Sequence, residues 1–199
     1  MSHDEQKLKA VIGLGNPGRE YEQSRHNVGF MVAQRLVSRG GGRLKKGRGD
    51  GVTARVELAG TQVLVGMPHT YMNLSGQFVQ AQMSFYRLAP PDILIVYDEM
   101  DLPPGRLRLA RGGGTAGHRG MESIVGMAGR NDFPRLRVGI GKPPGSRDTV
   151  DWVLTRVERE HAAAFEASLE EAVAAVETWV RGGIEVAMNR HNHFIFENT

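Results

Sequence analysis

Residues 92–97 read DILIVY, and this stretch predicts the clearest core strand of the 199-residue chain. An uninterrupted apolar run of this length is typical of a strand that is covered on both faces. Three acids follow it closely, Asp98, Glu99 and Asp101. Because ligands of open α/β sheets bind at the carboxyl ends of strands, these acids are candidates for a functional site.

Strand and helix patterns alternate on both sides of this stretch. Further strands are predicted at 8–14, 52–58, 62–67, 106–110 and 136–141, and helices at 27–39, 74–88 and 121–129. A long amphipathic helix is expected at 158–181, ended by Gly182 and Gly183 and followed by a last short helix. The alternation predicts an α/β fold, with residues 1–199 forming a single-domain, three-layer sandwich around a mixed, mostly parallel sheet and a C-terminal helical segment.

Composition excludes several classes of protein. The chain has no cysteine, so disulfides, thiolate metal sites and cysteine nucleophiles are excluded. Its polar N-terminus, MSHDEQKLKA, does not resemble a signal peptide, and no apolar run approaches the roughly 18 residues of a membrane span. We therefore expect a cytoplasmic protein that does not insert into a membrane.

The basic residues are unevenly distributed, although the net charge is only +3. They gather at 35–48, 106–119 and 130–147, whereas acids concentrate at 158–177. Clustered cations in a nearly neutral chain favour a polyanion-binding face, and phosphate is the usual target. Scattered, solvated arginines are the alternative interpretation.

Residues 13–18, GLGNPG, satisfy the glycine pattern of dinucleotide-binding folds. Two features count against that interpretation. The end of the motif predicts a turn where a helix is required, and no acid lies between Glu22 and Asp50 to bind a ribose. An NADP-dependent oxidoreductase thus rests on this motif alone. Asn16 either aims its amide at a ligand or simply makes the turn.

His26 lies in a polar loop directly before a predicted helix. An imidazole there can titrate near neutrality, as a general base requires, but a solitary loop histidine needs a partner. Asp98, the acid nearest the strand end, could accept the Nδ1 proton of a histidine and stabilise the imidazolium. Metal ligation is disfavoured because no second acid cluster or histidine pair offers completing ligands at a recognisable spacing.

Two further polar loops are candidates for binding or catalysis. In MPHTYMNLSG (67–76), Asn73 either caps the following helix or donates to a developing oxyanion. GGGTAGHRG (112–120) opens a helix whose N–H groups could hold a phosphate, but it lacks the ending of a nucleotide triphosphate loop. No G-x-S-x-G motif supplies a serine nucleophile, so direct attack by water is favoured.

Taken in order along nearly the whole chain, these segments resemble the bacterial peptidyl-tRNA hydrolase family. The resemblance rests on VIGLGNPG with Tyr21 and Arg25-His26-Asn27, and on PHTYMNLSG, DEMDLPPG, GGGTAGHRG and LRVGIGKP. It implies a monomeric, cytoplasmic α/β hydrolase that cuts the ester of peptidyl-tRNA with water. It also implies that no metal or other cofactor is needed, and that the substrate is bound by its acceptor stem and CCA end.

The resemblance further implies a role for each matching residue. His26 matches the general base, Asp98 the carboxylate that holds it, and Asn16 the residue that recognises the first peptide unit. Substrate or tRNA contacts are expected at Tyr21, Tyr71, Met72, Asn73, His118, Arg108 and Arg135.

One position departs from the family pattern. Where the family has GHNG, this chain has His118-Arg119-Gly120. Arginine supplies only donors and a permanent charge, so we expect Arg119 to bind the terminal phosphate or the substrate carbonyl. A catalytically altered RNA-binding relative of the same fold is the main alternative function.

Overall fold

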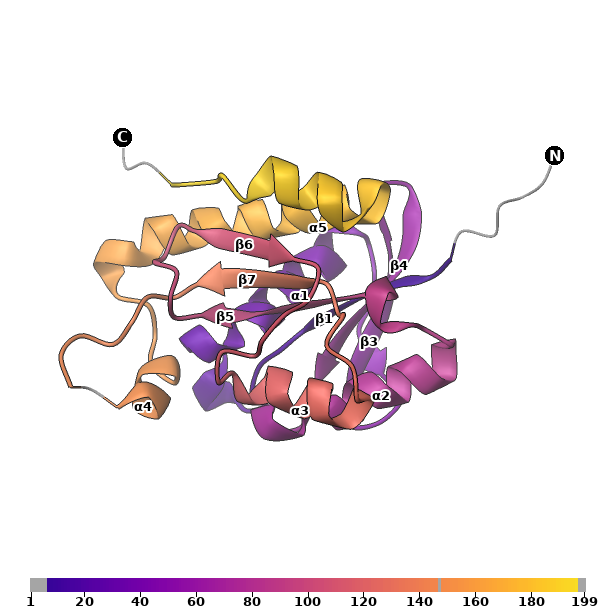
Figure 1. Ribbon diagram of the computed structural model, residues 1–199, viewed down its shortest axis with the longest axis horizontal. Coiled ribbons are helices and arrows are strands. Elements are labelled where there is room, and N and C mark those ends of the chain that lie inside the picture. The colour runs from indigo at the N-terminus through magenta and orange to yellow at the C-terminus, as the bar shows by residue number, and fades with distance from the viewer. Residues whose placement is uncertain (1–6, 147, 197–199) are drawn as a thin grey trace.

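The computed structural model describes residues 7–146 and 148–196 (Figure 1). All seven strands belong to one sheet, in the order β2-β3-β4-β1-β5-β7-β6. Neighbouring strands β4, β1, β5 and β7 are parallel, whereas β3 and β6 pair antiparallel with β4 and β7. The strands are β1 (Lys9–Gly13), β2 (Lys45–Lys46), β3 (Gly51–Leu58), β4 (Thr61–Pro68), β5 (Ile93–Glu99), β6 (Leu107–Ala110) and β7 (Arg135–Gly139).

Helices cover both faces of the sheet, and an apolar core lies on each side (Figure 1). Helices α1 (Val28–Arg39) and α5 (Ala162–His191) pack on one face. Helices α2 (Ser75–Tyr86) and α3 (Arg119–Ala128) pack on the other. The predicted α/β sandwich around a mixed sheet is therefore confirmed.

Two short elements were not predicted, β2 and α4 (Thr149–Val153). Strand β2 has two residues, too few for a hydrophobic alternation to be visible in the sequence. Helix α4 has five residues and is capped by the Asp148 carboxylate, which accepts from the N–H groups of Val150 and Asp151.

The long C-terminal helix changes direction at Gly183, as the glycine pair predicted. Gly183 has φ 80° and ψ −179°, a conformation that favours glycine. Just before the break, Lys9 donates to the carbonyls of Trp179 and Val180. Among the residues that the structure describes, no helix is both long and apolar enough to cross a membrane.

Direct backbone contact fixes α1 against the sheet. A Cβ atom on Gly13, at the end of β1, would lie 2.1 Å from the carbonyl oxygen of Gly29 in the first turn of α1. A Cβ atom on Gly29 would lie 2.4 Å from the carbonyl oxygen of Val96 in β5. Only glycine allows this approach, which places the residues preceding α1 beside the carboxyl end of β5.

Candidate active site

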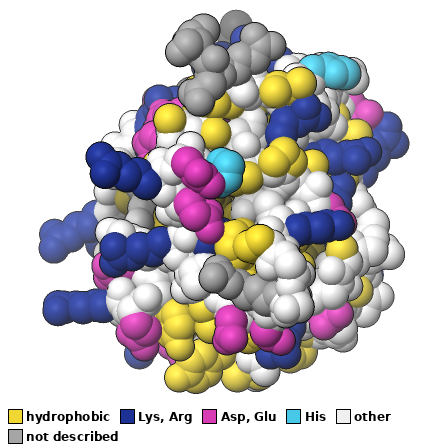
Figure 2. All heavy atoms as spheres, turned by 90° about the vertical axis from the view of Figure 1, so that its left-hand side faces the viewer, with side chains coloured by type: hydrophobic (Ala, Val, Ile, Leu, Met, Phe, Trp, Pro, Cys, Tyr) yellow, Lys and Arg dark blue, Asp and Glu magenta, His cyan; other side chains and the backbone are white. Residues whose placement is uncertain are grey.

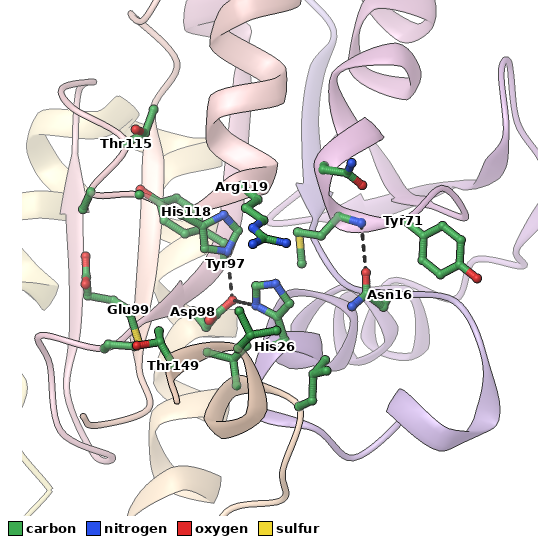
Figure 3. A pocket seen from close by; sticks show the side chains of 18 residues that line it. Asn16, His26, Tyr71, Tyr97, Asp98, Glu99, Thr115, His118, Arg119 and Thr149 are labelled. Atoms are coloured by element: carbon green, nitrogen blue, oxygen red, sulfur yellow. Dashed lines mark hydrogen bonds and ion pairs between the residues drawn. The ribbon is translucent and has the colours of Figure 1, made fainter. Parts of the chain in front are cut away.

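A cavity of about 500 Å³ opens at the carboxyl ends of β1 and β5, where parallel strands of α/β folds present their ligand sites (Figure 3). On the face of the molecule shown in Figure 2, Lys and Arg side chains lie on both flanks and hydrophobic side chains lie between them. The cavity is lined by Asn16, His26, Tyr71, Met72, Asn73, Tyr97, Asp98, Glu99, Met100, Thr115, Ala116, Gly117, His118, Arg119, Thr149, Val150, Val153 and Leu154.

Two histidines meet one carboxylate in this cavity. Oδ1 of Asp98, on β5, lies 2.8 Å from Nδ1 of His26 and 3.0 Å from Nε2 of His118 (Figure 3). The sequence predicted the pairing of His26 with Asp98 but not the contact of His118. The sequence held one indication of this contact, the position of His118 directly before α3. In the structure His118 caps α3, because its Nδ1 accepts from the N–H of Met121.

The protonation of this cluster follows from its geometry. Nδ1 of His118 accepts a hydrogen bond, so in the neutral ring the proton sits on Nε2 and is donated to Asp98. Burial alone would raise the pKa of Asp98, which is 4% exposed, but His26 and His118 lower the pKa below its usual range. An ionised Asp98 accepts the Nδ1 proton of His26 and leaves Nε2 of His26 available as a base.

Arg25 holds the histidine loop in place, a role that the sequence motif did not reveal. Its guanidinium is 1% exposed and lies 3.7 Å from the ring centre of Trp152 in α4. It donates to the Thr155 hydroxyl, the Arg156 carbonyl and the Glu158 carboxylate. The loop that carries His26 is thereby tied to the segment that forms one wall of the cavity.

Asn16 is fixed by a small polar network on the opposite side of the cavity. Its Oδ1 accepts from the N–H of Met72 at 2.9 Å, and its backbone N–H and carbonyl both bond to the Asn27 amide. With Oδ1 occupied, the Nδ2 donor of Asn16 remains for a ligand. The turn interpretation and the ligand interpretation of Asn16 are therefore compatible.

Several predicted substrate contacts line the same cavity. Tyr71 and Asn73 have exposed side chains, with Tyr71 63% exposed, and Met72 between them is buried. Arg119 is exposed, and its guanidinium points into the cavity between His118 and Asn16 (Figure 3). Tyr21 is half-buried and lies in a short 3₁₀ helix outside the lining.

The structure corrects the expectation for Arg135. This side chain is 1% exposed and donates to the carbonyls of Gly114 and Asn131, so it supports the glycine-rich loop and cannot reach a tRNA phosphate. Arg108 is exposed on edge strand β6 and does not line the cavity. Arg147, which contributes to the third basic stretch, lies outside the described residues.

Sequence spacing also missed a potential set of metal ligands. One ligand atom each from His26, Asp98 and His118 lies within 4.8 Å of the others. Both histidines present N–H groups to Asp98, because Nδ1 of His118 accepts from Met121 and leaves the proton on Nε2, and Nδ1 of His26 faces the carboxylate. This hydrogen-bonded arrangement offers an ion no free imidazole lone pair at Asp98, and it fits a carboxylate that orients two histidines better than metal ligation.

An apolar wall that the sequence did not indicate faces the histidines. It combines Met100, after β5, with Val150 and Val153 of α4 and with Leu154. Asn16 and Tyr71 lie on the other side of the histidines (Figure 3), and Asn73 also lines the cavity. The cluster of His26, Asp98 and His118 thus lies in a cavity with one polar side and one apolar side.

Comparisons with known proteins agree with this geometry. The family model described as peptidyl-tRNA hydrolase matches residues 10–198. The peptidyl-tRNA hydrolase of Nocardia farcinica is 45% identical over 183 residues, which cover 90% of this chain and 94% of the relative. That of Syntrophomonas wolfei is 40% identical over 185 residues, covering 93% and 100%. A crystal structure of the peptidyl-tRNA hydrolase from Acinetobacter baumannii matches with a TM-score of 0.88 at 37% identity, covering 96% of this chain and 97% of that chain.

Proposed function

Because the chain belongs to the peptidyl-tRNA hydrolase family and hydrolyses peptidyl-tRNA, we propose that His26 is the general base of this reaction. The observation that carries the proposal is the 2.8 Å contact between Nδ1 of His26 and Asp98. It orients the imidazole with Nε2 free to bind water.

The proposed reaction is a direct attack by water on the ester. A water bound at Nε2 of His26 attacks the carbonyl carbon that joins the peptide to the terminal ribose, and its proton passes to Nε2. Asp98 stabilises the resulting imidazolium. When the tetrahedral intermediate collapses, the bond to the ribose oxygen breaks and that oxygen takes the proton from Nε2. Peptide acid and free tRNA leave, and no metal or other cofactor is required.

Two asparagines are proposed to position the substrate. The Nδ2 group of Asn16 donates to the carbonyl of the first peptide bond, which a free aminoacyl group lacks. This explains a preference for N-blocked esters, because Oδ1 of Asn16 is already held by Met72. Asn73, exposed on the same side of the cavity, donates to the developing oxyanion.

The tRNA contacts are proposed from exposed groups around the cavity. Arg119 lies at the first turn of α3 and would bind the terminal phosphate of the CCA end. Arg108 on β6 would bind acceptor-stem phosphates, and Tyr21 and Tyr71 offer rings to the unpaired CCA bases. We further propose that the chain acts as a monomer of one domain in the cytoplasm, supported by a sheet that runs through the described residues and by the lack of cysteine.

One experiment tests the base and the substrate class together. Wild type and His26→Ala would be compared on N-acetylaminoacyl-tRNA and on free aminoacyl-tRNA. We expect wild type to cleave the blocked ester selectively and the variant to lose this activity while retaining tRNA affinity. Undiminished hydrolysis by a folded His26→Ala variant would remove His26 from the mechanism.

A further inference from the structure

A group of exposed cations lies at the edge of the sheet formed by β2. We call it the β2 edge patch, and it consists of Arg43, Lys45, Lys46 and Arg48. Within the described part of the chain, none of the four forms an ion pair with a carboxylate. The segment 43–50 contains one acid, Asp50, so its positive charge is left largely uncompensated.

Several other clustered cations are neutralised by neighbouring acids. Arg35 and Arg39 on α1 pair with acids of α5, Glu166, Glu170 and Glu177. On the opposite side of the sheet, Arg111, Arg130, Arg137 and Lys142 each pair with an acid. Arg106, Arg108 and Arg119 also have no carboxylate partner in the described structure. The β2 edge patch is therefore a second group of cations, at the other edge of the sheet, whose charges are free to attract phosphate.

A hydrogen bond anchors the patch to α2, and an aromatic ring lies beside it. Gln82 of α2 is fully buried and donates to the carbonyl of Arg48. The Arg48 guanidinium lies 4.0 Å from the ring centre of Phe85, which is 52% exposed. Cations beside an exposed ring are typical of surfaces that bind the backbone of RNA and stack an unpaired base.

The position of the patch relates it to the cavity. Gly51, the first residue of β3, pairs with Pro68, the last residue of β4, and the N–H of His69 donates to the carbonyl of Asp50. The β4 strand leads directly into Tyr71 at the cavity. The patch thus lies at the same end of the sheet as the cavity, on the flank opposite to β6 and Arg108.

We propose that the β2 edge patch is a second RNA-binding surface, which takes phosphodiester groups outside the catalytic cavity and stacks a base on the Arg48–Phe85 pair. Lysines on an edge strand also prevent sheets from associating. That role accounts for Lys45 and Lys46 only, and it requires neither the two arginines nor the exposed ring. The occupant is a remote part of the substrate tRNA, because the patch lies at the same end of the sheet as the cavity.

The test uses matched pairs of exposed arginines. Arg43→Gln/Arg48→Gln removes two charges from the patch, and Arg181→Gln/Arg190→Gln removes two exposed charges from α5. Binding of deacylated tRNA and of an unrelated RNA hairpin would be measured by fluorescence anisotropy over a range of salt concentrations. Thermal unfolding would establish that both variants are folded.

We expect the patch variant, and not the α5 variant, to lose salt-dependent affinity. Two lost phosphate contacts should reduce the slope of log K against log[salt] by about 1.4–1.8. Hydrolysis of an N-acetylaminoacyl ester of the CCA trinucleotide should be unchanged in both, which separates this surface from the catalytic residues. Equal RNA binding by the two variants would overturn the proposal.

A second measurement tests the occupant. KM for full-length N-acetylaminoacyl-tRNA should rise in the patch variant and stay unchanged in the α5 variant. An unchanged KM with a lower affinity for the hairpin would assign the surface to a separate RNA and contradict the proposal. A further variant, Phe85→Ser, should weaken binding of a single-stranded RNA without altering the salt slope.

Discussion

His26 and His118 donate hydrogen bonds to the same oxygen of Asp98, at 2.8 and 3.0 Å. The two histidines come from segments 92 residues apart and have different second partners. His118 is anchored at its other nitrogen by the N–H of Met121, whereas Nε2 of His26 faces the cavity. This asymmetry supports the proposal that His26 transfers the proton, and it suits His118 to orienting Asp98.

The asymmetry predicts unequal effects of removing each ring. His26→Ala should reduce kcat on N-acetylaminoacyl-tRNA by about 10²–10⁴-fold. His118→Ala should reduce kcat only about 10-fold, which corresponds to the loss of one hydrogen bond to a charged group, because the hydrogen bond between Asp98 and His26 remains. It should also lower the free energy of unfolding by about 0.5–2 kcal/mol, since α3 loses its cap. Single-turnover rates and urea unfolding would measure these effects, and equal rate losses would reject the assignment.

The lowered pKa of Asp98 predicts a pH-dependent contribution to stability. Because this pKa is lower in the folded than in the unfolded chain, the ionised carboxylate stabilises the fold above the unfolded value of about 4. The contribution is lost as the pH falls through the folded value. The difference in unfolding free energy between wild type and Asp98→Asn, measured by urea unfolding, should therefore be present at pH 5 and should shrink below pH 4. A difference that does not change with pH would contradict the ionised state.

Asn16→Asp should change substrate selectivity without disturbing the fold. The new carboxylate still accepts from the N–H of Met72 but has no amide to donate to a peptide carbonyl. We expect kcat/KM for the N-blocked ester to fall by about 10–100-fold, because the peptide carbonyl loses its hydrogen bond from Nδ2 of Asn16 and is left without a partner. The free aminoacyl ester, whose ammonium group the carboxylate attracts, should be cleaved relatively better. The ratio of the two rates is the measurement, and an unchanged ratio would exclude Asn16 from selectivity.

Arg119→Asn restores the family's usual residue and tests the role of the extra charge. If Arg119 binds a phosphate, the slope of log(kcat/KM) against log[salt] should become shallower by about 0.7–0.9. The kcat value should change little, because Arg119 does not contact His26 or Asp98 through a hydrogen bond in the described structure. Arg87→Asn, on the far end of α2, provides a control with the same charge change. Identical slopes for wild type and Arg119→Asn would rule out the phosphate contact.

Arg25→Lys should loosen the wall of the cavity while preserving the charge. Lysine cannot reach Thr155, Arg156 and Glu158 together or stack on Trp152. We expect a loss of about 1–3 kcal/mol in unfolding free energy, because the buried Arg25 side chain makes hydrogen bonds that lysine cannot replace. A lower kcat/KM should accompany it, with an unchanged pH profile because the base is the same. Arg19→Lys, at an exposed site, is the control; equal stability of the two variants would show that Arg25 is dispensable.

Much of the fold follows from local patterns. The run at 92–97 and the glycine pair after 181 correspond to β5 and to the break in α5 at Gly183, because burial and backbone conformation at those places depend on few neighbours. Strand β2 and helix α4 were missed because both depend on tertiary contacts. β2 exists only by pairing with β3, and Trp152 of α4 packs on Arg25.

The sequence predicted the site residues whose type and position in the chain together indicate a single role. Acids at the end of a core strand and a histidine before a helix led to Asp98 and His26, which the structure brings together. The sequence could not show the role of each arginine, because the same side chain can face solvent, bind a phosphate or donate to a buried carbonyl. Arg135 and Arg137 are two residues apart on β7 and so point to the same face of the sheet. Even so, Arg135 is buried, whereas Arg137 pairs with Glu99. Only the fold decides which of them meets a ligand.

The contact between the backbones of Gly13 and Gly29 has a consequence for how the enzyme tolerates mutation. Neither residue has a polar side chain or touches the ester. A methyl group on Gly13 would nevertheless collide with α1 at 2.1 Å, and one on Gly29 would collide with β5 at 2.4 Å, so α1 would have to move away from the sheet. Chains with such a change could keep their cores and still misplace the imidazole. If every position were substituted and each variant assayed for hydrolysis, substitutions at Gly13 and Gly29 should therefore reduce activity about as much as those at His26. The positions that tolerate no change would then include residues beneath the cavity as well as residues that line it.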